Sequence, residues 1–443
     1  MFATRSMNRK LSWALALLLP AAVSDLSAQP ADPIQQLEQK VQELQRQIQV
    51  LVDEIEDLKV GEAAQPEAEK SRYGLGPAAS KVYEVKRGVS IGGYGELLYE
   101  NFAGRREDGS ESGRSTQVDF LRGVVYLGYK FSDRWVFNSE LEFEHASTDD
   151  EGEVSVEFAT LDYFYRPRLN FRAGLVLVPM GFLNEQHEPP TFLGAKRTAV
   201  EGAIIPTTWR ENGIGFFGTT RRLSYRAYAI TGFDGAGVNH SGFSARGLRG
   251  GRQRGSEALA EDLAFVGRLD ATPRPGLLVG GSLYVGNSGQ GARAPTGEAI
   301  QARTSVGELH FDWQQRGWQF RGLWTRASVD QADRLNQLLG YSGDQSVGSV
   351  LDGWYLQAGY DLLSHSFSAA ESLIPYLRFE LLNTQKEVPG GFFASPENDQ
   401  RIWTFGIAYK PLLNVIFKAD YQWISNQAST GVDQLNLALG YLF

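Results

Sequence analysis

Apolar and polar residues alternate along most of the chain from residue 87 onward. Successive side chains of an extended strand point to opposite sides, so this alternation puts apolar residues on one face and polar residues on the other. About sixteen such segments of roughly ten residues follow one another, separated by turn residues. In residues 401–410, the apolar face consists of Trp403, Phe405, Ile407 and Tyr409. The pattern predicts an all-β chain.

The connections between these segments alternate between long and short. Long ones are residues 102–115, 146–153, 179–212, 233–261, 287–300 and 329–350, and short ones are 132–133, 167–168, 221–222, 273–275 and 411–412. Bacterial outer-membrane barrels show this asymmetry, with long loops outside and tight turns on the periplasmic side. The segments also have about the length of a tilted membrane strand. The sequence therefore predicts a transmembrane antiparallel β-barrel of about 16 strands over residues 87–443.

Two observations limit this prediction. Residues 363–373 are a long connection where a short turn is due, so the strand count holds to within about two. A soluble β-sandwich would also alternate, but its outer faces would be polar. Here charged residues such as Arg172, Glu140 and Asp420 stand opposite apolar stripes, which a closed, wet lumen explains directly.

The longest connection for which the strands on both sides are clear is Pro179–Asn212. It has 34 residues, is rich in Pro, Gly and charge, and shows neither strand nor clear helix periodicity. A compact domain rarely keeps so long a structureless loop unless the loop is functional. We expect it to fold into the mouth of the barrel and to set what passes.

The N-terminal part has a different organisation. Basic residues precede a short apolar run and small residues follow it, which predicts a signal peptide over residues 1–28. Residues 29–60 predict a coiled coil, because apolar residues recur at spacings of three and four. These residues are Ile34, Leu37, Val41, Leu44, Ile48, Leu51, Ile55 and Leu58. This apolar stripe predicts a homo-oligomer, either a dimer or a trimer. Residues 61–86 show no clear pattern, and we interpret them as a linker between the coiled coil and the barrel.

Composition narrows the function. The chain has no Cys, which excludes disulfides, thiolate metal sites and cysteine nucleophiles. Loss of residues 1–28 removes three basic residues and one acid and takes the net charge from −9 to −11, which disfavours nucleic acid as a partner. No segment after residue 28 has 18 consecutive apolar residues, so no helical membrane span is expected. Without the strand pattern, a soluble periplasmic protein would fit equally well.

The third long loop and the final strand resemble known proteins. The strand 432–443 ends on Phe443 and resembles the C-terminal signature of outer-membrane proteins. The runs 184–190 (NEQHEPP), 204–209 (IIPTTW) and 213–215 (GIG) resemble the phosphate-selective porin O/P family, over residues 87–443. The resemblance implies a trimer of sixteen-stranded barrels in the bacterial outer membrane, with one pore per subunit and the coiled coil in the periplasm. Its implied partners are outer-membrane lipid, lipopolysaccharide and small hydrophilic or anionic solutes.

The predicted inward faces carry charges of both signs. Candidate pore-lining and anion-contact residues are Arg122, Arg172, Arg226, Arg268, Arg321 and Arg378. They stand among at least as many carboxylates, so phosphate selectivity does not follow from the charges. Cross-strand ion pairs that merely stabilise a wet wall are the alternative interpretation.

The third loop has its own candidates. Its predicted constriction residues are Asn184, His187, Lys196, Arg197 and Arg210. Rings of side chains of one sign are a way in which pores select ions. The loop also contains four Glu residues, which would instead pin it to the wall by ion pairs, and both readings stay open. In the fourth long loop a basic cluster, Arg246, Arg249, Arg252 and Arg254, would attract anions, bind lipopolysaccharide phosphate, or simply be solvated.

Catalysis is not expected. The five His residues, His145, His187, His240, His310 and His365, lie in no nucleophile motif and at no metal-ligand spacing. We therefore expect no enzyme, no metal and no cofactor. The function that fits best is passive diffusion of small hydrophilic solutes, with a weak anion preference. The alternative is a plugged structural or adhesive barrel that is tethered through its coiled coil.

Overall fold

The computed structural model describes residues 40–47, 71–146, 152–365 and 371–443. Residues 40–47 are helical and exposed, and they belong to a unit separate from the rest of the described chain. They lie within the predicted coiled coil 29–60, whose remaining residues, like the predicted signal peptide 1–28, lie outside the described residues. Both assignments stay predictions. Among the described helices, none is long and apolar enough to cross a membrane.

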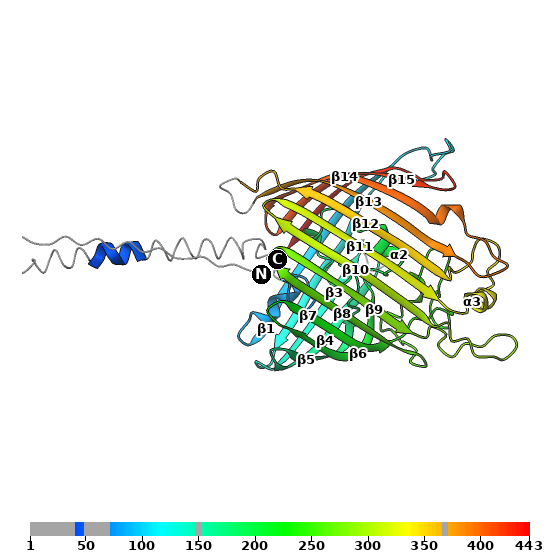
Figure 1. Ribbon diagram of the computed structural model, residues 1–443, viewed down its shortest axis with the longest axis horizontal. Coiled ribbons are helices and arrows are strands. Elements are labelled where there is room, and N and C mark those ends of the chain that lie inside the picture. The colour runs from blue at the N-terminus through cyan, green and yellow to red at the C-terminus, as the bar shows by residue number, and fades with distance from the viewer. Residues whose placement is uncertain (1–39, 48–70, 147–151, 366–370) are drawn as a thin grey trace, which may run out of the picture. The chain divides into compact units, whose positions relative to one another are not determined.

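Sixteen antiparallel strands form one closed barrel (Figure 1). Each strand pairs with its neighbours in the chain, and β1 closes the barrel against β16, with Tyr94 opposite Leu442 and Phe102 opposite Gln434. A closed barrel pairs every strand on both sides, so no strand edge is left open. The predicted fold class and strand number are confirmed. The strands are β1 Gly88–Phe102, β2 Gln117–Lys130, β3 Trp135–Glu144, β4 Val154–Arg166, β5 Leu169–Leu177, β6 Arg210–Thr219, β7 Leu223–Thr231, β8 Leu263–Arg274, β9 Leu277–Gly286, β10 Thr304–Gln315, β11 Trp318–Val329, β12 Val350–Tyr360, β13 Ser372–Glu387, β14 Asp399–Leu412, β15 Val415–Asn426 and β16 Gln434–Leu442.

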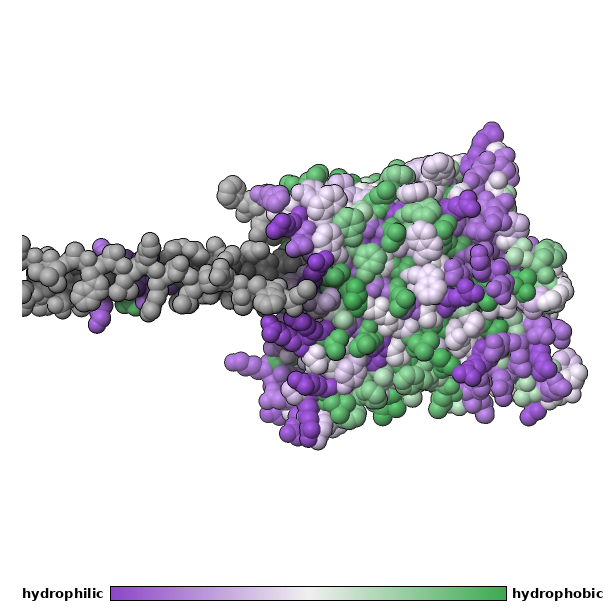
Figure 2. All heavy atoms as spheres, in the orientation of Figure 1, coloured by the Kyte–Doolittle hydropathy of each residue, from purple (hydrophilic) through white to green (hydrophobic). Residues whose placement is uncertain are grey.

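The two faces of the wall differ as the alternation predicts. On β14, Trp403 and Phe405 are exposed on the outer face, whereas Ile402, Thr404 and Lys410 are buried on the inner face. Figure 2 shows the result over one side of the barrel, with apolar side chains across the middle of the wall and hydrophilic ones toward both ends. An apolar outer belt between polar ends is the surface that a lipid bilayer requires of a barrel.

Long and short connections leave the barrel at opposite ends. The short turns include residues 131–134, 167–168, 220–222, 275–276, 316–317 and 413–414. The connection between β12 and β13, which broke the predicted alternation, also falls on this side, and its described residues 361–365 and 371 form no strand. Short helices occur in the long loops, namely η3 Pro189–Thr191, α2 Ala199–Ala203, η4 Arg249–Gly251, α3 Ala332–Leu339 and η5 Pro396–Asn398.

Residues 71–86 are folded inside the barrel, where the sequence predicted a linker. They contain the 3-10 helix η2 Ala79–Tyr83. The Ala79 carbonyl accepts a hydrogen bond from Asn138 Nδ2 at 2.8 Å, and the Tyr83 hydroxyl donates to Asp162 at 2.8 Å. Arg172 donates to the Tyr83 hydroxyl at 3.1 Å. The linker prediction is wrong for these residues because their contacts are with distant strands, which a local pattern does not reveal.

The loop between β5 and β6 also lies in the lumen. It spans residues 178–209, because Arg210, Glu211 and Asn212, which were predicted to end the loop, already pair in β6. Asn184 fastens its two ends together. The Asn184 side chain donates to the carbonyl oxygens of Val178 (2.5 Å) and Trp209 (2.9 Å) and accepts from the Trp209 backbone N–H (2.6 Å).

Carboxylates then fix this loop to the rest of the lumen. Glu201 accepts hydrogen bonds from the backbone N–H groups of Phe182 and Leu183, both at 2.8 Å, and from the Tyr355 hydroxyl of β12 at 2.8 Å. Glu188 accepts from the backbone N–H of Ala78 at 3.0 Å, so it joins the loop to residues 71–86. The acidic residues of the loop therefore act as anchors.

Hydrophobic packing is most extensive on one side of the lumen, and smaller buried clusters lie elsewhere along the wall. The largest buried cluster joins loop residues such as Met180, Ile204 and Trp209 to inner residues of β7 to β12. Trp209 is fully buried and stacks on Phe233 with ring centroids 4.3 Å apart. Trp209 therefore packs the loop against the wall.

Replacing Gly174 by Ala should destabilise the barrel. Gly174 has a φ of +128°, and an added Cβ would overlap the carbonyl oxygen of Ala159 on the paired strand. Strain of this kind costs about 1–3 kcal/mol. We expect Gly174→Ala to lower the urea midpoint of unfolding in detergent micelles. Gly307→Ala is the matched control, because the atom nearest to its added Cβ is 4.0 Å away. Equal midpoints for the two variants would contradict the prediction.

The anchor at Glu188 should make stability depend on pH. Burial raises the pKa of Glu188 from 4.5 to about 7, and this effect outweighs the Ala78 and Ala79 N–H groups, which lower it. The folded state thus binds this proton more tightly, so the contribution is fully present below about pH 4.5 and is lost as the pH rises through about 7.

We expect Glu188→Gln to flatten the fall in unfolding free energy between pH 4.5 and 8, by up to about 3 kcal/mol. Burial also raises the pKa values of Glu185 and Glu201, so the wild type and Glu188→Gln should share a residual slope. The exposed Glu257→Gln serves as the control. A Glu188→Gln variant with the wild-type pH profile would disprove the assignment.

Candidate functional site

The six predicted wall arginines all face the lumen, and each lies beside a carboxylate. Because strand alternation places them inside the barrel, and because a buried charge is costly without a partner, opposite charges on neighbouring strands meet there. The pairs are Arg122 with Glu96 (3.1 Å) and Glu142 (3.1 Å), Arg172 with Asp162 (2.8 Å), Arg226 with Asp270 (2.5 Å) and Glu185 (3.2 Å), Arg268 with Asp270 (2.9 Å), Arg321 with Asp312 (2.5 Å), and Arg378 with Glu380 (2.9 Å). This geometry favours the interpretation as a stabilised wall over a ladder of free anion contacts.

Three of the five predicted loop residues are engaged in the interior. Asn184 binds backbone groups of its own loop. His187 Nε2 lies 3.1 Å from Glu140 Oε1 of β3, and its Nδ1 lies 3.0 Å from the Asn184 carbonyl oxygen. Arg210, now in β6, pairs with Glu157 of β4 at 2.5 Å. His187 thus joins the loop to β3, Asn184 closes the loop on itself, and Arg210 joins two strands of the wall.

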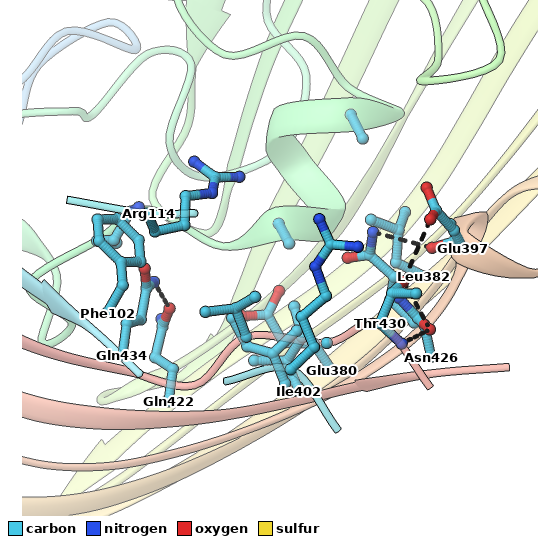
Figure 3. A pocket seen from close by; sticks show the side chains of 18 of the residues that line it. Phe102, Arg114, Glu380, Leu382, Glu397, Ile402, Gln422, Asn426, Thr430 and Gln434 are labelled. Carbon is cyan, nitrogen blue, oxygen red and sulfur yellow. Dashed lines mark hydrogen bonds between the residues drawn. The ribbon is translucent and has the colours of Figure 1, made fainter. Parts of the chain in front are cut away.

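Lys196 and Arg197 instead border an open vestibule. The vestibule has a volume of about 790 Å³ and lies at the long-loop end of the barrel, between loop residues 196–203 and the strands β13 to β16 and β1 (Figure 3). Figure 3 shows Phe102 and Arg114 across the cavity from Glu397 and Thr430. Much of the remaining wall is amide side chains, including those of Gln422 and Gln434, which share a hydrogen bond.

The charges around the vestibule are unequal. Five basic side chains line it, and three carboxylates oppose them. The basic residues are Arg106, Arg114, Lys196, Arg197 and Arg246, and the acidic ones are Glu100, Glu380 and Glu397. Glu100 is already bound to Lys196 at 2.6 Å, and Glu380 to Arg378 at 2.9 Å. A surplus of positive charge on a cavity wall raises the local concentration of anions.

Arg197 has unused hydrogen-bonding capacity. Its Nε and Nη2 atoms are buried and have no hydrogen-bond partner among the described residues. Burial, together with the positive charge of Arg122, lowers the pKa of Arg197 below its ordinary value. Nε and Nη2 form one edge of the guanidinium group, whose spacing matches two oxygens of a carboxylate or phosphate. Arg197 therefore adds positive charge to the vestibule wall without a hydrogen-bond partner at this edge.

Below the vestibule the loop is tied to β15. Lys418 Nζ donates to the Gly194 carbonyl oxygen at 2.9 Å and lies 3.5 Å from the centre of the Phe192 ring. Asp420 accepts from the Ala195 backbone N–H at 2.7 Å. A second cavity, of about 20 Å³, borders residues 190–193 toward the short-turn end. The segment around Gly194 and Ala195 thus separates the two cavities.

Sequence reasoning did not single out Arg106 and Arg114, and it placed Arg246 in a different cluster. All three come from long outer loops, and their approach to one cavity depends on how those loops fold back over the barrel. In the described part of the chain, no group of three or more His, Asp or Glu residues is arranged to hold a metal ion. The arrangement offers binding and steering of charge.

Comparison with known proteins gives a family relationship and a fold. No protein-family model matches the chain. An uncharacterized protein of Aquifex aeolicus (strain VF5) is 40% identical over 369 residues, which is 81% of each chain.

Among solved structures, the complex of Salmonella typhi OmpF with daunomycin has a TM-score of 0.52 at 10% identity, over 81% of this chain and 98% of OmpF. The outer membrane channel DcaP of Acinetobacter baumannii has a TM-score of 0.49 at 10% identity, over 80% of this chain and 97% of DcaP. The chain therefore belongs to the same family as the Aquifex aeolicus protein, and its fold is that of the outer-membrane porins.

Proposed function

We propose that the protein is an outer-membrane porin through which small hydrophilic solutes, preferably anions, diffuse passively. The observation that carries this proposal is the inward loop 178–209, which is tied to β3, β12 and β15 of a closed barrel and leaves a charged vestibule above it. Inward loops that narrow a barrel select solutes by pore width and by the charges around the narrowest point. No cofactor or chemical step enters this function.

The polar lining on one side of the lumen supports a path for solutes on that side. The strands β7 to β12 pack against the loop through a hydrophobic cluster, whereas the strands β13 to β16 and β1 border the vestibule with polar and charged groups. A hydrated solute avoids the apolar half because it would lose its hydrogen bonds there. The path would therefore run from the vestibule past Gly194 and Ala195, and toward the second cavity.

Phosphate as a preferred solute is the finer part of the proposal. It is supported by the resemblance of residues 184–215 to the phosphate-selective porin O/P family, and by the basic surplus and the free edge of Arg197. The same resemblance supports a trimer in the outer membrane with a periplasmic coiled coil. The outward apolar belt supports contact with membrane lipid.

A closed tether is the second candidate. Residues 71–86 and the loop 178–209 together fill a large part of the lumen, and Glu188 joins them. A barrel filled in this way would serve as an adhesive or structural element held by its coiled coil. Solute flux distinguishes the two candidates.

Removal of the vestibule cations should reduce the anion preference. In planar bilayers under a salt gradient, we expect the zero-current potential of Arg114→Gln/Arg197→Gln to shift toward cations. The shift should correspond to a fall of about twofold or more in the anion-to-cation permeability ratio, because the local positive potential is lower. Arg221→Gln/Arg222→Gln, with the same charge change on an exposed short turn, should behave like the wild type. An unchanged potential in the vestibule variant would refute the anion preference.

Deletion of residues 71–86 should increase the single-channel conductance. These residues occupy the lumen, so their removal widens the aqueous path. The measurement is stepwise conductance of the intact and shortened proteins, after a folded barrel has been verified for both by heat-modifiable migration on gels. Steps from the intact protein support the porin. If only the shortened protein conducts, the intact protein is a plugged barrel and the porin proposal is wrong.

A further inference from the structure

A basic cleft lies at the rim of the barrel, apart from the vestibule. Its volume is about 820 Å³, and it is lined by Glu153 and the start of β4, by Leu175 and Arg210, and by loop residues 239–241, 249–250 and 252–256. It shares no lining residue with the vestibule. The sequence left the basic cluster of this loop open as an anion site, a lipopolysaccharide contact or a solvated loop. Its arginines do not act together, because Arg246 turns to the vestibule while Arg249, Arg252 and Arg254 line the cleft.

The two central arginines of the cleft have only neutral partners. Arg252 is buried, with a relative exposure of 3%. It donates hydrogen bonds to the carbonyl oxygens of Thr207 (2.6 Å) and Thr208 (3.1 Å). The exposed Arg249 donates to the same Thr207 carbonyl at 2.9 Å. Within the residues that the structure describes, neither guanidinium forms an ion pair.

Glu153, which lines the cleft, and the neighbouring Glu157 already have ion-pair partners. Glu157 is bound to Arg210 at 2.5 Å, and Glu153 lies 3.4 Å from Arg254. Burial, followed by the charges of Arg249 and Arg254, lowers the pKa of Arg252 to about 8. Cations held close together without a counter-charge are stabilised by an anion that binds several of them at once.

The other border of the cleft is apolar and faces outward. Val154 and Val156 are exposed on the outer face of β4, and Leu175 stands beside them on β5. The loop crosses over the rim at this point, because the Gly255 carbonyl oxygen accepts from Asn212 Nδ2 at 3.1 Å and Gly255 packs against Leu175. The cleft thus joins a cluster of cations to the apolar wall.

We infer that this rim cleft is a binding site for a phosphate-bearing anion. A phosphate offers several oxygens to the exposed donors of Arg249 and Arg254 and neutralises the charge on Arg252 behind them. The apolar border formed by Val154, Val156 and Leu175 fits the acyl chains of a phosphorylated lipid, and a free phosphate would use the cations alone. The inference rests on the membrane placement in the proposed function and is independent of conduction.

The test uses the full-length protein in detergent, with Arg249→Gln/Arg252→Gln as the variant. Arg221→Gln/Arg222→Gln is the control, since it removes the same charge at an exposed short turn. One arm measures by native mass spectrometry the binding of lipid A with two phosphates and of the same lipid without them. A second arm measures inorganic phosphate by equilibrium dialysis. A gel assay of heat-modifiable migration verifies folding in both arms.

We expect the wild type and the control to bind the phosphorylated lipid, and the cleft variant to bind it about tenfold or more weakly, as the loss of charge-assisted hydrogen bonds implies. If the wild type binds inorganic phosphate but not the lipid, and the cleft variant loses this binding, the site is supported and its ligand is a soluble phosphate. Equal binding by variant and control would overturn the inference. If the double variant does not fold, Arg249→Gln alone gives the same comparison, because Arg249 is exposed. We expect these variants to have the conductance of the wild type, which would show that the cleft does not take part in conduction.

Discussion

The structure depends on the requirement that a charge inside the barrel meets an opposite charge or several hydrogen bonds. Closing sixteen strands gives the wall an inner face on which every second side chain loses most of its water. The cost of an unpaired ion there is several kcal/mol, which few other contacts would offset. Wall arginines therefore stand beside carboxylates, and the loop carboxylates Glu188 and Glu201 accept backbone N–H groups. These same bonds determine where the loop 178–209 lies.

Binding sites for anions are then expected where basic side chains lack carboxylate partners. Two places in the described chain collect basic side chains in excess of carboxylates, the vestibule and the rim cleft. In the vestibule, Arg197 keeps two donors without a partner, and at the rim, Arg249 and Arg252 bind only neutral oxygens. Fixed surplus charge of this kind attracts mobile anions because the protein does not supply them itself. One physical rule thus accounts for both the stable wall and the candidate sites.

Most of the fold could be predicted from the sequence, and most of the site could not. Alternation and turn spacing are local properties, so they predicted the strand number, the lumen-facing arginines and the inward loop. Residues 71–86 carry no local pattern, and their partners Asn138, Asp162 and Glu188 are distant in the chain. The register that brings Arg226 to Asp270, and the loop paths that bring Arg114 and Arg246 to one cavity, also depend on tertiary structure.

The two halves of the lumen have different physical roles. Apolar packing of Ile204 and Trp209 against the strands β7 to β12 is non-directional and excludes water, so it holds the loop as a rigid body. The opposite edge of the loop combines a small apolar contact at Leu193 with directional bonds to Lys418 and Asp420 of β15. Directional bonds can exchange with water or with an anionic solute at little net cost, whereas a packed core cannot. The edge of the loop beside β15 is therefore where water or an anionic solute can most readily replace a bond made by the protein.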